Sequence, residues 1–154
     1  MTENDKPGVL VFPPLLFTGG VVCGVVAHLV CPYRFAFGAW PRWIGAGLGL
    51  AAVLFALWGE RTMKAAGTNV RPTLPALVIV STGPFAFTRN PLYLGVLGLY
   101  SGIGLALASP PFLAVLVPMF AVLHVGIVAR EERYLEAKFG DVYRAYKARV
   151  RRWI

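Results

Sequence analysis

Two long stretches of the chain contain no charged side chain, and they set the expected architecture. Residues 7–33 and residues 90–129 lack Asp, Glu, Lys and Arg altogether. An α-helix needs roughly 20 apolar residues to cross the hydrocarbon core of a bilayer. The first stretch is therefore long enough for one crossing and the second for two, and the predicted helices are residues 9–30, 91–108 and 112–129.

A fourth apolar helix is predicted at residues 43–58, with residue 39 as an alternative start. It is rich in Gly and Ala, which allow close contact between helices in lipid. Trp40 and Trp58 lie near its ends, where interfacial aromatic residues are common. A Ser-Pro-Pro sequence at residues 109–111 predicts a tight turn between the last two crossings. The expected fold class is all-α: a polytopic membrane helical bundle of about four transmembrane helices in a single domain, residues 1–154.

The remaining segments have a different composition. Residues 60–89 contain four cations and several prolines, and their only apolar run, residues 77–80, is too short to span a bilayer. We expect a cytoplasmic loop that dips into the interface. After the fourth crossing, charged and apolar residues alternate in an amphipathic pattern. This helix is therefore expected to continue into the cytoplasm through residues 130–149.

The distribution of the 15 cations predicts the orientation. Only 14% of the residues are charged, against about 25% in a typical soluble domain. With both ends in the cytoplasm, 13 cations lie inside and only Arg34 and Arg42 lie outside, as the positive-inside rule favours. Eight cations fall in residues 130–154, beside an apolar run, where anionic lipid explains the net charge of +8 better than nucleic acid does. The expected location is the inner membrane, with cytoplasmic N- and C-termini.

Two segments on the predicted cytoplasmic side contain residues that ordinary membrane loops do not require. In residues 81–87, Gly83 permits unusual backbone angles and Pro84 fixes the turn that follows. In residues 88–95, Asn90 is expected to cap a helix that begins at Pro91, and Arg89 adds a cation that can bind a carboxylate. Taken alone, each segment fits a plain turn or a capped helix start better than a ligand site.

A third segment combines carboxylates with aromatic residues. Glu131 and Glu132 are adjacent at the end of an apolar helix, where such groups need partners. Tyr143, Tyr146 and Arg149 follow at three-residue steps, so we expect them to share one helix face. Alone, this pattern fits a solvated amphipathic tail as well as it fits a binding site.

In combination, the three segments resemble the isoprenylcysteine carboxyl methyltransferase family of membrane enzymes. The resemblance rests on Gly83-Pro84-Phe85, Arg89-Asn90-Pro91-Leu92-Tyr93-Leu94-Gly95, Glu131-Glu132, and Phe139-Gly140 followed by Tyr143, Tyr146, Arg149 and Val150. It covers residues 67–154, and the first two helices carry no signature. The chain departs from the pattern at Asn90, where many members have His, so a role that requires an imidazole is not carried over to this position.

The resemblance implies methyl transfer from S-adenosylmethionine at the membrane surface. Glu131 and Glu132 are expected to bind the amino group and ribose hydroxyls of this cofactor, and the helix start with Arg89 its carboxylate. Arg149 would orient a carboxylate acceptor, whereas an amine or hydroxyl acceptor would use Glu132 as a base. The implied cofactor-binding residues are Gly83, Phe85, Arg89, Asn90, Pro91, Tyr93, Leu94, Glu131, Glu132 and Tyr143. The implied catalytic residues are Arg149, Glu132 and Tyr146.

Other functions stay open on the sequence alone. NADPH-dependent membrane sterol reductases share a similar Arg-x-Pro-x-Tyr and acidic pattern, but they are generally longer. A scaffold or small transporter is disfavoured because transporters place polar groups near the bilayer midplane. The expected partners are membrane lipid and a lipophilic or lipidated acceptor that enters from the bilayer. We expect no metal site, and we interpret His124 as a structural, hydrogen-bonded residue.

Overall fold

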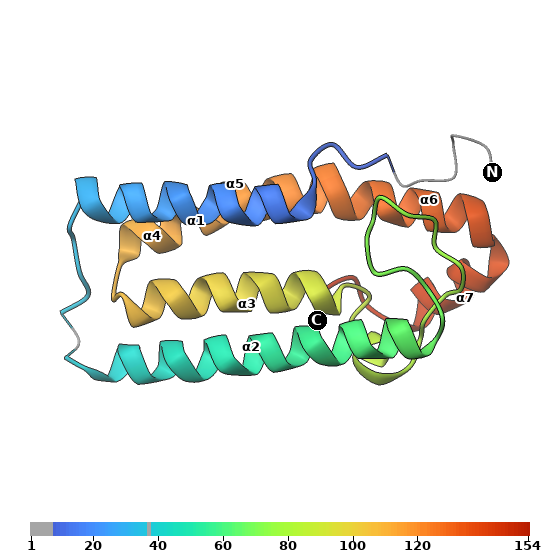
Figure 1. The fold of residues 1–154 in the computed structure, drawn as a ribbon, viewed down its shortest axis with the longest axis horizontal. Helices are drawn as coiled ribbons and strands as arrows, with labels where there is room; N and C mark the ends of the chain where they lie inside the picture. Colours follow the sequence, from blue (N-terminus) through green and yellow to red (C-terminus); the bar gives the residue numbers. More distant parts are fainter. Residues whose placement is uncertain (1–7, 37) are drawn as a thin grey trace.

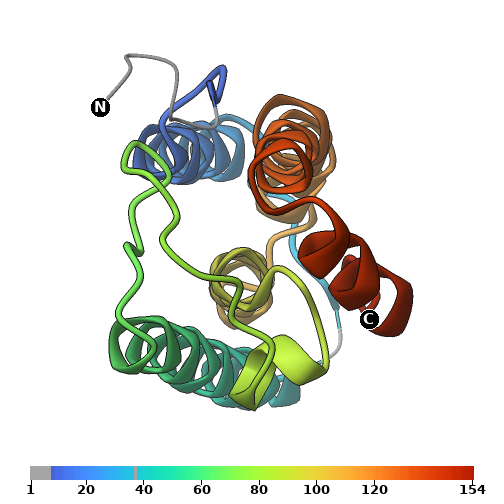
Figure 2. The same ribbon diagram turned by 90° about the vertical axis from the view of Figure 1, so that its right-hand side faces the viewer.

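The computed structural model describes residues 8–36 and 38–154, and these residues form a helical bundle without a β-strand. α1, α2, α3 and the segment from α4 to α6 run side by side (Figures 1 and 2). The elements are α1 (Pro13–Val30), α2 (Trp40–Ala65), the 3₁₀-helix η1 (Gly83–Ala86), α3 (Pro91–Ala106), α4 (Pro110–Ala114), α5 (Leu116–Val122), the π-helix η2 (Leu123–Val128), α6 (Ala129–Phe139) and α7 (Asp141–Arg149). The predicted fold class, a helical membrane bundle, is confirmed.

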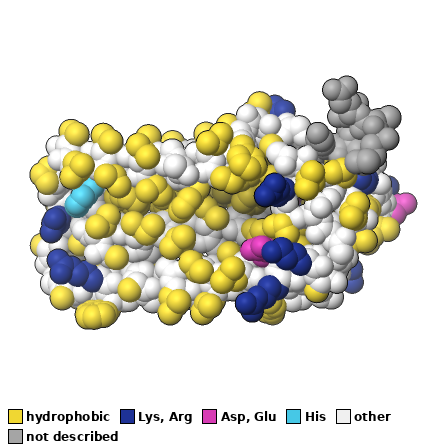
Figure 3. Space-filling model, in the orientation of Figure 1, with side chains coloured by type: hydrophobic (Ala, Val, Ile, Leu, Met, Phe, Trp, Pro, Cys, Tyr) yellow, Lys and Arg dark blue, Asp and Glu magenta, His cyan; other side chains and the backbone are white. Residues whose placement is uncertain are grey.

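The surface of the bundle is that of a membrane protein. Among the described residues, α1, α2 and the segment Pro110–Phe139 are long and apolar enough to cross a bilayer, and α3 is a shorter apolar helix of 16 residues. Leu29, Val30 and Trp43 are 71–79% exposed, which suits contact with lipid chains. Hydrophobic side chains cover much of the face in Figure 3, and the cations lie at its left end and in its right-hand half. The chain is therefore an integral membrane protein.

Small residues bring the backbones of α2 and α3 together. A Cβ added at Gly102 of α3 would lie 2.7 Å from the carbonyl O of Gly45 and 2.7 Å from the backbone N of Gly49 on α2. A Cβ added at Gly95 would lie 2.8 Å from the carbonyl O of Ala52. In lipid, helices associate through such close packing rather than through the hydrophobic effect. The predicted Gly- and Ala-rich contact surface is thus the α2–α3 interface.

Helix α2 is longer than the predicted residues 43–58. It begins at Trp40 and ends at Ala65, so its last turns replace the start of the expected loop. The charged continuation stays helical because the Lys64 ammonium pairs with the Glu60 carboxylate one turn earlier (2.5 Å). The loop proper is therefore shorter than the predicted residues 60–89, and it contains the turn η1.

The turn between α3 and α4 lies where the Ser-Pro-Pro sequence predicts it. Ala108 adopts a left-handed backbone conformation with φ of 49°, which ends α3. The hydroxyl of Ser109 then accepts a hydrogen bond from the backbone N–H of Phe112 (3.3 Å) and so caps α4. His28 Nδ1 of α1 lies 2.9 Å from the same hydroxyl. This contact links the C-terminal end of α1 to the hairpin.

The segment from α4 to α6 is a long helix with two irregular points. Pro118 has no N–H to bond to the carbonyl of Ala114, and α4 and α5 are separated there. Residues 123–128 form the π-helix η2, a wider turn that is frequent at functional sites. η2 leads directly into α6, which carries Glu131 and Glu132.

The expectation of one continuous helix through residues 130–149 is wrong. α6 ends at Phe139, and Gly140 adopts a φ of 52°, which Gly tolerates because it has no Cβ. α7 then turns back beneath α6 (Figure 1) and contacts that helix. The Lys147 ammonium lies 3.0 Å from the Glu136 carboxylate and links α7 to α6. This reversal brings the aromatic residues of α7 to the site described next.

Candidate functional site

A cavity of about 860 Å³ lies between α1, residues 68–80, α3, the α5–α6 segment and α7. One part of its lining is apolar and comes from the membrane helices: Leu16, Phe17, Val96, Leu97, Met119 and Leu123. The polar part of its lining includes Arg89, Asn90, Tyr93, Glu131, Glu132, Tyr134, Tyr143 and Tyr146. The cavity thus joins a polar, predicted cytoplasmic region to an apolar region between membrane helices.

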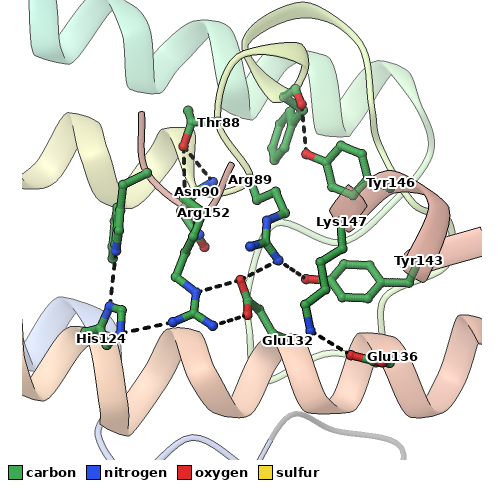
Figure 4. A network of polar contacts seen from close by, with 12 residues as sticks. Thr88, Arg89, Asn90, His124, Glu132, Glu136, Tyr143, Tyr146, Lys147 and Arg152 are labelled. Carbon is green, nitrogen blue, oxygen red and sulfur yellow. Dashed lines mark hydrogen bonds and ion pairs between the residues drawn. The ribbon is translucent and has the colours of Figure 1, made fainter. Parts of the chain in front are cut away.

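Glu132 is the centre of the polar network in Figure 4. Its carboxylate is 5% exposed and receives two guanidinium groups. Arg89 NH1 lies 2.8 Å from Oε1, while Arg152 binds Oε1 through Nε (3.0 Å) and Oε2 through NH2 (2.6 Å). The hydrogen bond to Glu132 raises the pKa of Arg152. Charged groups this deeply buried are stable only when they are paired in this way.

Arg89 has a donor that the protein does not use. Its side chain is 9% exposed, and its NH1 group contacts Glu132 and the hydroxyl of Tyr143 (3.5 Å). Its Nε is buried and has no hydrogen-bond partner within residues 8–36 and 38–154. A buried donor without an acceptor is unfavourable by about 1–3 kcal/mol. Arg89 is one of the residues that line the cavity, so this unpartnered donor belongs to a side chain beside the space where a ligand would bind.

Glu131 differs from Glu132 in its partners. The hydroxyl of Tyr93 on α3 donates a hydrogen bond to Glu131 Oε1 at 2.6 Å. Both residues line the cavity, and Glu131 is more exposed than Glu132. Sequence reasoning expected both carboxylates to bind the cofactor and assigned the role of a base to Glu132. In the structure Glu132 is held by two guanidinium groups, and Glu131 is the carboxylate positioned by an aromatic hydroxyl.

Asn90 does not have the capping role that the sequence predicted. Its side chain makes no cap hydrogen bond to α3, although Pro91 begins the helix as expected. Instead Asn90 Nδ2 donates to the carbonyl O of Arg152 (2.9 Å), and Thr88 Oγ1 donates to the same oxygen (3.1 Å). The backbone N–H of Arg89 donates to the carbonyl O of Arg151 (3.0 Å). Asn90 therefore binds residues 150–154, which we call the tail segment, to the start of α3.

His124, in η2, is a hydrogen-bonded residue outside the cavity lining. Arg152 NH1 lies 3.0 Å from its Nε2, and Trp153 Nε1 lies 3.1 Å from its Nδ1 (Figure 4). A neutral imidazole has one acceptor nitrogen, so it accepts from one of these two donors at a time. Trp153 also packs against Phe120, with ring centroids 5.2 Å apart. These contacts agree with the interpretation of His124 as structural.

Tyr143 and Tyr146 of α7 are buried and line the cavity. Tyr146 donates a hydrogen bond to the carbonyl O of Phe85 (2.8 Å) and so connects α7 to η1. Burial, assisted by the charge of Glu132, raises the pKa of Tyr143 to about 12. Burial also raises the pKa of Tyr146. Both phenols therefore stay protonated at neutral pH; Tyr146 donates its hydrogen bond to Phe85, whereas Tyr143 accepts one from Arg89.

The expectation that Arg149 shares the face of these tyrosines is wrong. Its side chain is exposed and outside the cavity lining, and its Nε donates to the carbonyl O of Ala145 in its own helix (3.3 Å). A three-residue step falls about 60° short of a full helical turn, so two steps rotate Arg149 by about 120° from Tyr143. The guanidinium that reaches the site belongs to Arg152 instead.

The other predicted cofactor-binding residues divide into two groups. Phe85, Pro91 and Tyr93 line the cavity. Gly83 and Leu94 do not; Gly83 has a φ of 58° and packs against Trp58 and Thr62 of α2. Arg152, His124 and Trp153 were not predicted as site residues. The nearest signal in the sequence was the group of basic residues after α7, which pointed to lipid instead.

Comparisons with known proteins agree with this geometry. The model of the phospholipid methyltransferase family matches residues 40–142. An "Uncharacterized protein" of Haemophilus influenzae (strain ATCC 51907 / DSM 11121 / KW20 / Rd) is 70% identical over 27 residues, which are 18% of this chain and 43% of that protein. The match thus spans less than half the length of this relative. No solved structure matches the chain.

Proposed function

Because the chain belongs to the phospholipid methyltransferase family, which confirms the resemblance to membrane methyltransferases, we propose that it transfers a methyl group from S-adenosylmethionine to a lipophilic acceptor. The observation that carries the cofactor assignment is the buried Nε of Arg89. A cavity that holds a cation with an unused donor, beside two carboxylates, fits a ligand that has both a carboxylate and cationic groups.

The residues present fit the charged groups of S-adenosylmethionine. The N–H groups of Leu92 and Tyr93 lie in the first turn of α3, before its first intrahelical hydrogen bond at Leu94, and the helix dipole favours an anion there. Together with Arg89, this helix start would bind the carboxylate. Glu131, positioned by Tyr93, would bind the amino group. Glu132 is engaged by two arginines, so we assign it to orienting Arg89 rather than to direct contact with the ribose.

The chemistry then requires mainly alignment and the exclusion of water. When bound, S-adenosylmethionine supplies an electrophilic methyl group: the acceptor's lone pair forms the new bond to carbon while the carbon–sulfur bond breaks and sulfur keeps its electrons. A carboxylate acceptor loses no proton. An amine acceptor loses one, and Glu131 is the cavity carboxylate that would take it up.

The apolar part of the cavity indicates the acceptor's character. Side chains from α1, α3 and α5 line it, and these helices are surrounded by lipid in the membrane. A molecule with a reactive polar group and an apolar chain fits this arrangement, and it would enter laterally from the bilayer. We therefore propose a lipophilic or lipidated acceptor, with its reactive group at the Glu131 end of the cavity.

We expect S-adenosylmethionine to bind the detergent-purified protein, and Glu131→Gln to weaken this binding at least tenfold, about 1.4 kcal/mol. The reason is the loss of the negative charge that would hold the amino group. Isothermal titration calorimetry measures the affinity. Glu136→Gln is the matched control, because Glu136 is on the same helix and pairs with Lys147. A parent protein that binds NADPH and not S-adenosylmethionine would instead support the reductase alternative.

We also propose that the site faces the cytoplasm of the inner membrane. A single cysteine at position 71, after replacement of Cys23 and Cys31, is expected to react with a membrane-impermeant maleimide only in opened vesicles or inverted membranes. A cysteine at position 34 should react from outside the intact cell, because the positive-inside rule places the two isolated cations outside. Labelling of position 71 in intact cells would contradict this orientation.

A further inference from the structure

Arg152 is not among the residues that line the cavity, but it shares the carboxylate of Glu132 with Arg89, which does line it. The Nε and NH2 groups of Arg152 occupy both oxygens of Glu132, at 3.0 and 2.6 Å. Arg89 reaches this carboxylate through NH1 alone, at 2.8 Å. A carboxylate commonly receives two parallel hydrogen bonds from one guanidinium. Because Arg152 already makes this forked pair, Arg89 is left with an Nε that has no acceptor among the described residues.

We propose that Arg152 is a positioning residue of the methyl-transfer site. By holding Glu132 from behind, it keeps the Nε–H of Arg89 available for the carboxylate of S-adenosylmethionine. This inference rests on the proposed function. It gives the tail segment a part in cofactor binding, in place of the lipid contact that its basic composition suggested.

The position of Arg152 is fixed by contacts that do not depend on its own side chain. Its carbonyl O accepts hydrogen bonds from Thr88 and Asn90, and the neighbouring Trp153 packs on Phe120. The third nitrogen of the guanidinium, NH1, lies 3.0 Å from His124 Nε2. All three guanidinium nitrogens therefore have partners, a geometry that Lys cannot reproduce. A side-chain substitution removes the forked pair and leaves the backbone contacts of the tail segment in place.

The consequence of removing Arg152 follows from the charge that remains. Glu132 is 5% exposed, and its buried negative charge is strongly unfavourable without a closely paired cation. Arg89 is then the nearest guanidinium and turns to make the forked pair itself, with Nε as one of its two donors. The donor that we assign to the cofactor carboxylate is then engaged by Glu132 instead. The effect should appear in cofactor affinity and in the Michaelis constant for S-adenosylmethionine, while turnover at saturating cofactor changes little.

The test is a set of variants measured by calorimetry with S-adenosylmethionine in one detergent. Arg152→Ala is expected to weaken binding at least tenfold and Arg152→Lys three- to tenfold. Arg151→Ala is the matched control, because Arg151 has an exposed side chain on the adjacent residue and contributes only its carbonyl to the site. It should bind as the parent does. Thermal unfolding of each variant shows whether it is folded. If Arg152→Ala does not fold, Arg152→Lys provides the test, because it keeps the positive charge and removes only the forked pair.

A double-mutant cycle with Glu132→Gln separates positioning from direct contact. Gln cannot receive an ionic forked pair, so Arg152 has no means of acting on Arg89 in this background. The double variant should therefore bind within twofold of Glu132→Gln alone. A further tenfold loss in the double variant would mean that Arg152 binds the cofactor itself, and would overturn the proposal. Parent-like binding by folded Arg152→Ala overturns the positioning role alone, whereas a parent protein that does not bind the cofactor overturns the proposed function as well.

Discussion

Replacing Glu132 with Ala is expected to destabilise the folded protein by about 3–5 kcal/mol, the range for removing one partner of a buried ion pair. The loss arises mainly from Arg89, whose side chain is 9% exposed and would keep a buried charge without a carboxylate. Arg152, with its side chain 32% exposed, can turn toward water and should contribute less. Unfolding by denaturant in detergent micelles measures the difference in free energy from the parent protein.

Glu136→Ala is the control for this prediction. Glu136 lies one turn later on α6 and pairs with Lys147, but both side chains are about a third or more exposed. Exposed ion pairs contribute at most about 1 kcal/mol, so the free energy of unfolding of Glu136→Ala should differ from that of the parent by no more than this amount. Equal destabilisation of the two variants would show that the network around Glu132 adds nothing beyond a surface salt bridge.

Replacing Gly45 with Ala is expected to separate α2 from α3 and to destabilise the bundle by about 2 kcal/mol. The added Cβ would contact the backbone N of Ala106 and lie 2.5 Å from the carbonyl O of Gly102, and backbone atoms cannot move aside as flexible side chains do. Overpacking of this kind is unfavourable by about 1–3 kcal/mol. The higher helix propensity of Ala, about 1 kcal/mol relative to Gly, offsets part of it.

Gly47 offers a control in the same helix. A Cβ at Gly47 has no neighbour within 4 Å, so Gly47→Ala should raise stability by up to about 1 kcal/mol through helix propensity alone. Both variants are measured by the same unfolding experiment. A Gly45→Ala variant as stable as Gly47→Ala would mean that the α2–α3 contact is looser than the structure shows.

The proposed function depends on two features of the bundle: the close contact of α2 with α3 and the chain reversal at Gly140. The close α2–α3 contact places the start of α3, with Pro91 and Tyr93, beside the cavity. Gly140 reverses the chain, so that α7 brings Tyr143 and Tyr146 to the same cavity from the other side. The tail segment then binds to Thr88 and Asn90. The candidate site is therefore assembled from residues 85–93, 131–135 and 143–153, which only the folded bundle brings together.

The sequence by itself determined the membrane architecture and the family. Uncharged runs are a local property, because each residue in the hydrocarbon must be apolar whatever its neighbours are. The Ser-Pro-Pro turn was equally local, since Pro ends a helix through its own missing N–H. The motifs that resemble membrane methyltransferases were also readable, and the match over residues 40–142 confirms the family.

Only the tertiary structure decided which charged group meets which. Glu132 and Arg152 are 20 residues apart and Asn90 and Arg152 are 62 apart, so no helical periodicity relates them. The sequence placed Arg149 on the face of Tyr143 because a three-residue step is close to one helical turn. Each such step falls about 60° short of a full turn, so two steps rotate Arg149 by about 120° from Tyr143. The sequence placed Gly140 inside one continuous helix because a Gly can be helical or left-handed with little difference in energy. The pairing in the site thus depends on the chain reversal at Gly140, after which α7 reaches η1 through the hydrogen bond from Tyr146 to the carbonyl O of Phe85.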